Sequence, residues 1–136
     1  LTAQPSPLGR QAVHALASCL REPRIATDAL IQLGQLTPTA IPWLADELAN
    51  DEAHIRRGVV EALGRLTHPA ASASLQQALS DSDAIVRRQA IAALSRIGTR
   101  GVSRTLSELA HLDPSPGVRQ AGAAALHRQG PGRGAE

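Results

Sequence analysis

The stretch AIVRRQAIAALSRIG, residues 84–98, has two close relatives within the same chain of 136 residues. The segment AHIRRGVVEALGRLT precedes it at residues 53–67, and PGVRQAGAAALHRQG follows it at residues 116–130. In each segment apolar residues fall near positions i, i+4, i+7 and i+8, which is the pattern of one face of an α-helix. The stretch therefore predicts a helix that recurs along the chain.

A more divergent fourth copy precedes these three. The first apolar residues of the four copies are Ile25, Ile55, Val86 and Val118, which follow one another at nearly equal intervals. The closing leucines recur at the same intervals and are Leu33, Leu63, Leu94 and Leu126. Between them, one turn after each first residue, stand Ala29, Val59, Ala90 and Gly122. Matching intervals at several positions indicate one repeated helix with a constant apolar face.

A second helix is predicted between successive copies of the first. Prolines recur at a constant interval, at Pro7, Pro38 and Pro69. Ser6 and Thr37 precede the first two prolines and favour helix N-caps, while His68 takes that place in the third repeat and Thr99–Arg100 in the fourth. The apolar residues that follow are Val13, Leu44, Leu75 and Leu106. Pro42 lies near the start of its helix, so we expect local irregularity there.

The predicted helices alternate and are joined by short loops, so neighbours should be antiparallel. A single pair has too little apolar surface to fold alone, and stacked pairs bury a continuous core. We therefore predict an all-α protein, an α-α superhelix in the form of a right-handed solenoid of about four helical hairpins. The repeat domain should cover residues 7–129, with an N-terminal linker at 1–6 and a flexible tail at 130–136.

The repeated helices share the pattern Asp-x-x-x-x-Val-Arg-x-x-Ala-x-x-Ala-Leu. One copy meets it in full, with Asp81, Val86, Arg87, Ala90, Ala93 and Leu94. Another has Asp113, Val118, Arg119, Ala125 and Leu126 with Gly122 in place of the first alanine, and a third has Ile55, Arg56, Ala62 and Leu63 with Asp51 one residue closer. This pattern resembles HEAT-like repeats of the phycobilisome-lyase type. The resemblance implies a helical solenoid, a fold that occurs in scaffolds, regulators and a few enzymes.

Two sets of charged residues recur with the repeat. The first consists of Asp51, Asp81 or Asp83, and Asp113 with Arg56, Arg87 and Arg119, and we interpret it as structural. Each aspartate would cap its helix while each arginine reaches a neighbouring loop carboxylate, a feature that the HEAT resemblance also implies. The alternative is binding of phosphate or an acidic ligand. The second set is Arg57 and Arg88 with Arg65, Arg96 and Arg128, which we predict on the outer face of these helices.

This second set could follow a nucleic-acid backbone, but a solvated surface is the favoured interpretation. Glu61 lies on the same face, and no aromatic residue lies among the arginines to stack on bases. The net charge of the whole chain is only +2. A nucleic-acid partner is therefore not expected.

Trp43 is the single aromatic residue, and its counterparts in the other repeats are the small residues Ala12, Ser74 and Thr105. It is interpreted either as a binding anchor or as a side chain that packs on an adjoining helix and covers the Pro42 irregularity. By resemblance to HEAT-like arrays, the proline-initiated helices would line a concave, partner-binding surface. That surface would consist of Trp43, Asp46, Glu47, Asn50, Ser74, Gln77, Thr105 and Glu108. It is mildly acidic, and a protein with a basic or mixed segment would fit it.

Several kinds of chemistry find no support in the sequence. Lysine is absent and Cys19 is the single cysteine, which excludes a catalytic lysine, an internal disulfide and a cysteine-based zinc site within this chain. Hydroxylases built of HEAT-like repeats bind iron through His-Glu motifs, and none occurs here. We expect no catalytic residues, no metal and no cofactor.

The sequence favours a non-enzymatic protein-interaction module or scaffold, as a fragment of a larger protein. The first predicted helix is apolar around much of its circumference, so we expect it to pack on an upstream domain or subunit. No apolar run is long enough for a membrane span, and a cytoplasmic location is expected. The alternatives are a lyase-type or accessory enzyme subunit that handles a tetrapyrrole, and a nucleic-acid binder that uses the arginines of the second set.

Overall fold

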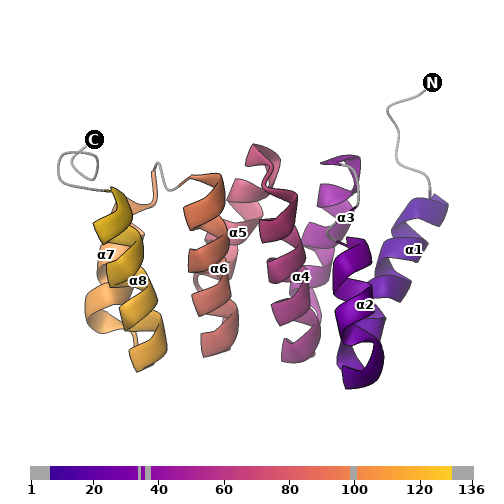
Figure 1. Ribbon diagram of the computed structural model, residues 1–136, viewed down its shortest axis with the longest axis horizontal. Helices are drawn as coiled ribbons and strands as arrows, with labels where there is room; N and C mark the ends of the chain where they lie inside the picture. Colours follow the sequence, from indigo (N-terminus) through magenta and orange to yellow (C-terminus); the bar gives the residue numbers. More distant parts are fainter. Residues whose placement is uncertain (1–6, 34, 36–37, 99–100, 130–136) are drawn as a thin grey trace.

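The computed structural model describes residues 7–33, 35, 38–98 and 101–129, and Figure 1 shows their helices in two rows. One row contains α1 (Pro7–Ser18), α3 (Ile41–Asp46), α5 (Ser72–Ala78) and α7 (Ser103–Leu112). The other contains α2 (Pro23–Leu33), α4 (Ala53–Leu66), α6 (Ala84–Ile97) and α8 (Pro116–Gln129). The described residues form no β-strand. The predicted all-α solenoid of stacked helical hairpins is confirmed.

The odd-numbered helices are less regular than the even-numbered ones. Short 3-10 turns adjoin them: η1 (Cys19–Arg21), η2 (Pro38–Ala40), η3 (Glu47–Ala49) and η4 (Pro69–Ala71). The irregularity expected at Pro42 is confirmed, because α3 has only 6 residues and lies between η2 and η3. Proline lacks the N–H that an α-helix needs and crowds the preceding turn.

The cap predicted at His68 is also confirmed, since its Nδ1 accepts a hydrogen bond from the N–H of Ala70 at 3.0 Å. The other predicted caps, Ser6, Thr37 and Thr99–Arg100, lie outside the described residues. So do the predicted linker at 1–6 and tail at 130–136.

The apolar core lies between the two rows and follows the predicted repeat positions. Fully buried side chains include Leu44, Leu75 and Leu106 from the odd row and Leu33, Leu63 and Leu94 from the even row. The ends of the stack depart from this pattern: Ile25 is 44% exposed and Leu126 is only partly buried. Each belongs to a helix at one end of the even row, which has an even-numbered neighbour on one side only.

The apolar face of α1 is turned into the molecule. Val13 and Ala17 of α1 are buried and Leu16 packs against the same core, which continues into η1 with Cys19 and the buried Leu20. The large apolar side chains exposed near this end belong to α2 instead, and they are Ile25 and Ile31. Packing of α1 on an upstream domain or subunit stays a prediction.

The even-numbered helices pack closely on one another, whereas the odd-numbered helices make few contacts with their odd neighbours. Accordingly, α1 and α7 lie outside α2 and α8 at the two ends of the molecule in Figure 1. Small residues allow the close approach, since a Cβ built on Gly64 of α4 would lie 2.8 Å from the Cβ of Ala93 of α6. The closely spaced row is the inner side of the stack, so the prediction that the proline-initiated helices line the concave surface is wrong.

Candidate interaction surface

Arginines of the even helices bind carboxylates of the next repeat. Arg56 donates from Nε and Nη2 to the carboxylate of Asp81 at 2.9 and 3.1 Å. Arg87 repeats this geometry with Asp113, at 2.8 and 2.9 Å. All four side chains are at most 13% exposed, so these two-point pairs link successive repeats inside the molecule. The predicted contact between each arginine and a neighbouring loop carboxylate is present in both pairs.

The same arginines also hold the loop before their own helix. Nη1 donates to the backbone carbonyl of Asn50 for Arg56, of Asp81 for Arg87 and of Asp113 for Arg119, at 2.7–2.8 Å. We call the set Arg56, Arg87 and Arg119 with Asn50, Asp81 and Asp113 the arginine ladder. Each guanidinium in it fixes its own loop, and those of Arg56 and Arg87 also fix the following one.

Asp51 does not belong to the ladder, contrary to the prediction. Its side chain is exposed, and only its backbone carbonyl contacts Arg56, at 3.1 Å. The equivalent position is Asn50, whose Oδ1 accepts from the N–H of Glu52 at 2.9 Å. Asp81 and Asp113 accept in the same way from residues two positions later. Asn50, predicted to contact a partner, is therefore a loop-bracing residue.

Of the two aspartates predicted as the cap of α6, Asp83 is the cap and Asp81 is not, because Oδ2 of Asp83 accepts from the N–H of Val86 at 3.0 Å. The cap predicted at Asp113 shifts by two residues. At α8 the hydroxyl of Ser115 accepts from the N–H of Val118 at 3.4 Å, and Asp113 precedes it. Asp81 and Asp113 thus brace the loop and receive an arginine, while the next polar residue satisfies the helix N-terminus.

Arg57 was predicted to point outward, but it forms a second link between repeats. Its Nε and Nη2 donate to the carboxylate of Asp83 at 2.9 and 2.8 Å. Hydrogen bonding from Arg57 lowers the pKa of Asp83 well below its usual value, and raises the pKa of Arg57. In the arginine ladder, hydrogen bonding from Arg87 likewise lowers the pKa of Asp113. Both carboxylates are therefore ionised at neutral pH.

Trp43 packs on the neighbouring odd helix. A Cβ built on Gly9 of α1 would lie 2.7 Å from Cη2 of the indole, so the ring covers this glycine closely. Glu47 contacts α1 as well, with 2.9 Å between its Oε2 and Nδ1 of His14. These contacts support the interpretation of Trp43 as a packing residue that joins α3 to α1.

The remaining residues of the predicted partner surface lie on the outer row. Asp46, Gln77, Thr105 and Glu108 are exposed and Ser74 is half-buried. Glu108 lies 3.6 Å from Arg104 in a largely solvated pair. Partner binding by these outer residues stays a prediction.

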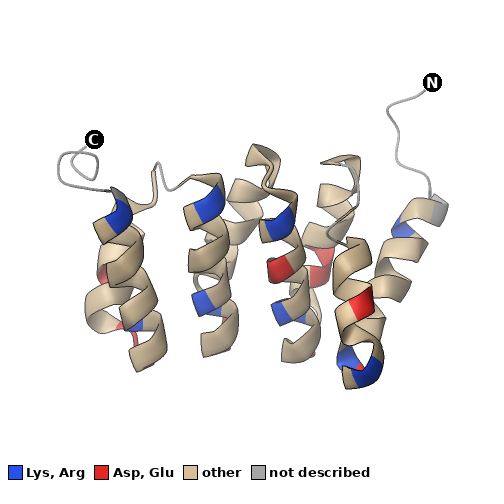
Figure 2. Ribbon diagram, viewed as in Figure 1, with Lys and Arg blue, Asp and Glu red and all other residues tan. Residues whose placement is uncertain are grey.

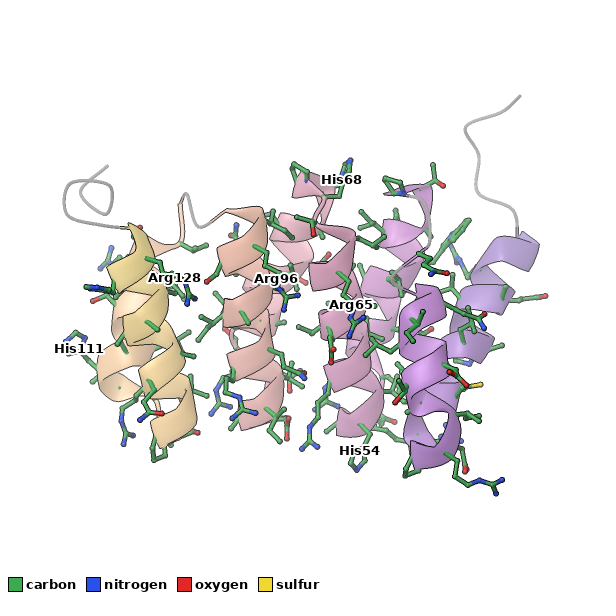
Figure 3. All side chains as sticks on the ribbon, in the orientation of Figure 1. His54, Arg65, His68, Arg96, His111 and Arg128 are labelled. Atoms are coloured by element: carbon green, nitrogen blue, oxygen red, sulfur yellow. The ribbon has the colours of Figure 1, made fainter. Side chains whose placement is uncertain are left out.

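On the opposite side of the molecule, the even helices share a surface stripe that sequence reasoning placed on the wrong side of the stack. Its members stand four residues apart: Arg57, Glu61 and Arg65 on α4, Arg88, Ala92 and Arg96 on α6, and Gln120, Ala124 and Arg128 on α8. We call these nine residues the inner stripe. Figure 3 shows Arg65, Arg96 and Arg128 in one row across the three helices, and Figure 2 shows this row of positive charge. The repeat spacing shows that these residues are equivalent. Only the close packing of the even-numbered helices on one another shows that they lie on the inner side of the stack.

The profile of HEAT repeats matches residues 41–127 of the chain. The chain belongs to the HEAT repeat family. The match is to HEAT repeats in general, and a relationship to the phycobilisome-lyase type stays a prediction.

Human deoxyhypusine hydroxylase, in a structure solved with glycerol, resembles this HEAT stack with a TM-score of 0.68 and 26% sequence identity. The alignment covers 89% of this chain and 44% of that chain, so the HEAT stack spans less than half of that protein's length. No curated protein sequence matches the chain.

Three of the histidines lie at different elements of the HEAT stack. His54 lies on α4, His68 before η4 and His111 on α7, as Figure 3 shows. Across the described residues, no three His, Cys, Asp or Glu side chains gather as a metal ion would require. None of the helices in the described ranges is both long enough and apolar enough to span a membrane.

Proposed function

We propose that the chain is a non-enzymatic scaffold that binds a protein partner along the inner stripe. The observation that supports this most directly is the alignment of equivalent, solvent-facing positions on three successive, closely packed helices. Such an arrangement presents side chains at regular intervals over a long surface, which suits an extended partner. Membership of the HEAT repeat family agrees with a scaffold role.

The links between repeats make this surface well suited to binding. The pairs Arg56–Asp81, Arg57–Asp83 and Arg87–Asp113 all join one repeat to the next. They fix how α4, α6 and α8 lie relative to one another. A surface that is already ordered loses little conformational entropy when a partner binds, so more of the contact energy appears as affinity.

Bulky substitutions on the two faces test this proposal. The tagged chain is used to capture proteins from an extract of its source cells, and each captured protein is then purified and its affinity measured. Ala92→Trp places an indole on the inner stripe, while Gln77→Trp places one on the outer row; both native side chains are exposed, so neither change should unfold the chain. We expect Ala92→Trp to abolish binding of the purified partner and Gln77→Trp to preserve it.

The reverse result would transfer the site to the outer row, where Asp46, Gln77, Thr105 and Glu108 lie. Binding that survives both substitutions would contradict a site on either face. Failure of every captured protein to bind directly after purification would contradict the scaffold function itself.

A further inference from the structure

The inner stripe is not uniformly charged, because its arginines differ in what surrounds them. On α4 both arginines have a carboxylate partner. Arg57 pairs with Asp83, and Arg65 pairs with Glu61 at 3.0 Å, one turn earlier on the same helix. The positive charge of this helix is therefore largely compensated within the chain.

The two equivalent arginines on α6, Arg88 and Arg96, have no carboxylate partner among the described residues. One repeat later, Ser115 occupies the position of Asp83, so the residue equivalent to the partner of Arg57 carries no charge. Ala92 likewise occupies the position of Glu61, so Arg96 has no acid one turn earlier. On α8 the corresponding residue is Ala124, which precedes Arg128.

The arginines Arg88, Arg96 and Arg128 are exposed, and none forms an ion pair with any described residue. The uncompensated charge of the inner stripe is thus concentrated over α6 and α8. We call these three residues the free arginines.

Two of the free arginines extend over the preceding helix, and one of them forms a hydrogen bond there. Arg128 of α8 donates from Nη2 to the hydroxyl of Ser95 of α6 at 3.0 Å. Arg96 of α6 reaches the equivalent place on α4, where its Nη1 would lie 3.4 Å from a Cβ built on Gly64. Contacts of this kind reduce the side-chain entropy that remains to be lost when an anion binds.

Exposed alanines lie between these charges. Ala92 stands midway between Arg88 and Arg96, which are eight residues or about 12 Å apart along α6. Ala124 lies one turn before Arg128 on the adjacent helix. We call Ala92 and Ala124 the alanine strip, which lies among the free arginines. The side chain of Arg88 extends beside α8, where its Nη1 would lie 3.6 Å from a Cβ built on Gly117.

We infer that the free arginines and their alanine strip form the docking site for an acidic helical segment of a protein partner. This inference rests on the proposed scaffold function and specifies its chemistry. A partner helix with two carboxylates eight residues apart would present them at the spacing that Arg88 and Arg96 have along the axis of α6, and small apolar residues midway would lie on Ala92. A nucleic acid fits less well, because bases would find no aromatic side chain to stack on.

Synthetic probes test the inference without the natural partner. The first probe is a helical peptide with two glutamates eight residues apart and alanine and leucine between them. A second peptide has glutamine in place of both glutamates, and a third probe is a short DNA duplex. We expect the acidic peptide to bind the chain, and the glutamine peptide and the duplex to bind roughly tenfold more weakly or not at all, since a few surface charge pairs account for about that difference.

Substitutions that exchange the environments of α4 and α6 provide the sharpest test. Ala92→Glu gives Arg96 the partner that Arg65 has, and should abolish binding of the acidic peptide. Glu61→Ala frees Arg65 and should strengthen binding. The triple variant Arg88→Gln, Arg96→Gln and Arg128→Gln should also lose binding. Its matched control changes three exposed arginines elsewhere, Arg10, Arg24 and Arg104, to glutamine and should bind normally with the same net charge.

If the triple variant and its control lost binding of the acidic peptide equally, the inference would be overturned, because binding would then depend on net charge alone. Tighter binding of the duplex than of the acidic peptide would replace it with a nucleic-acid site, and no binding of any probe would also overturn it. A partner that Ala92→Trp releases but Ala92→Glu retains would leave the scaffold function standing and remove only the acidic-segment chemistry.

Discussion

At the scale of single residues, a shift of one position decides which carboxylates stabilise the stack. Asp113 is buried, accepts two hydrogen bonds from Arg87 and braces its loop, whereas Asp51 leaves its carboxylate in solvent. Replacing Asp113 by Asn leaves the largely buried guanidinium of Arg87 without its counter-charge. We expect this to lower the free energy of unfolding by about 3 kcal/mol at neutral pH.

The matched change Asp51→Asn should alter the free energy of unfolding by no more than about 0.5 kcal/mol. Urea denaturation monitored by circular dichroism measures both variants. Because folding lowers the pKa of Asp113, its contribution is complete above the unfolded-state pKa of about 3.9 and is lost as the pH falls through the lower folded-state pKa. The difference in the free energy of unfolding between the wild type and Asp113→Asn should therefore become smaller as the pH is lowered. An equal decrease in the free energy of unfolding for Asp113→Asn and Asp51→Asn at neutral pH would contradict the assignment of Asp113, and not Asp51, to the arginine ladder.

The sequence predicted the residue types of this ladder but not its register. Asn50 and Asp51 are adjacent, both suit a turn before a helix, and the repeat length is not constant along the chain. Only the hydrogen bonds distinguish the residue that braces the loop from the one that faces water. The same limit applies to the inner stripe, whose arginines were aligned from their spacing but assigned to the outer face.

At the scale of helices, prediction succeeded where apolar periodicity and proline determine structure locally. It failed on which of the two rows is the more closely spaced, because that spacing depends on contacts between residues far apart in the sequence. Gly122 illustrates the point. The repeat pattern has alanine at this position, yet a Cβ built there would lie 3.1 Å from the backbone nitrogen of Ala110 and 3.1 Å from the backbone oxygen of Leu106.

We therefore expect Gly122→Ala, which restores the repeat pattern, to destabilise the chain by about 1–3 kcal/mol through overpacking against α7. Alanine favours helix over glycine by about 1 kcal/mol, so an uncrowded site would show the opposite sign. Gly117, also on α8, is the control, because its built Cβ would be no closer than 3.6 Å to any neighbour. Thermal unfolding should show a lower midpoint for Gly122→Ala and an unchanged or higher one for Gly117→Ala. A higher unfolding midpoint for both variants would show that α7 moves away from the added methyl group at little cost in stability.

At the scale of the whole molecule, each repeat is stabilised mainly by its immediate neighbours, so the effect of a defect depends on its place in the stack. Leu63 and Leu126 occupy equivalent positions, but Leu63 is fully buried in α4 while Leu126 is only partly buried in α8. Leu63→Ala should cost about 2–5 kcal/mol, as expected for a buried leucine. Leu126→Ala should cost less, because its helix has an even-numbered neighbour on one side only.

The two substitutions should also differ in where protection from hydrogen exchange is lost. Because α4 packs on α2 and α6, a cavity at Leu63 weakens contacts on both sides, and amide exchange should accelerate along the whole stack. A cavity at Leu126 should accelerate exchange in α7 and α8 and leave α4 protected. Hydrogen–deuterium exchange read by mass spectrometry resolves these patterns. Uniform acceleration in both variants would mean that the chain unfolds as one cooperative unit, and the scaffold would then transmit a disturbance at either end to the inner stripe.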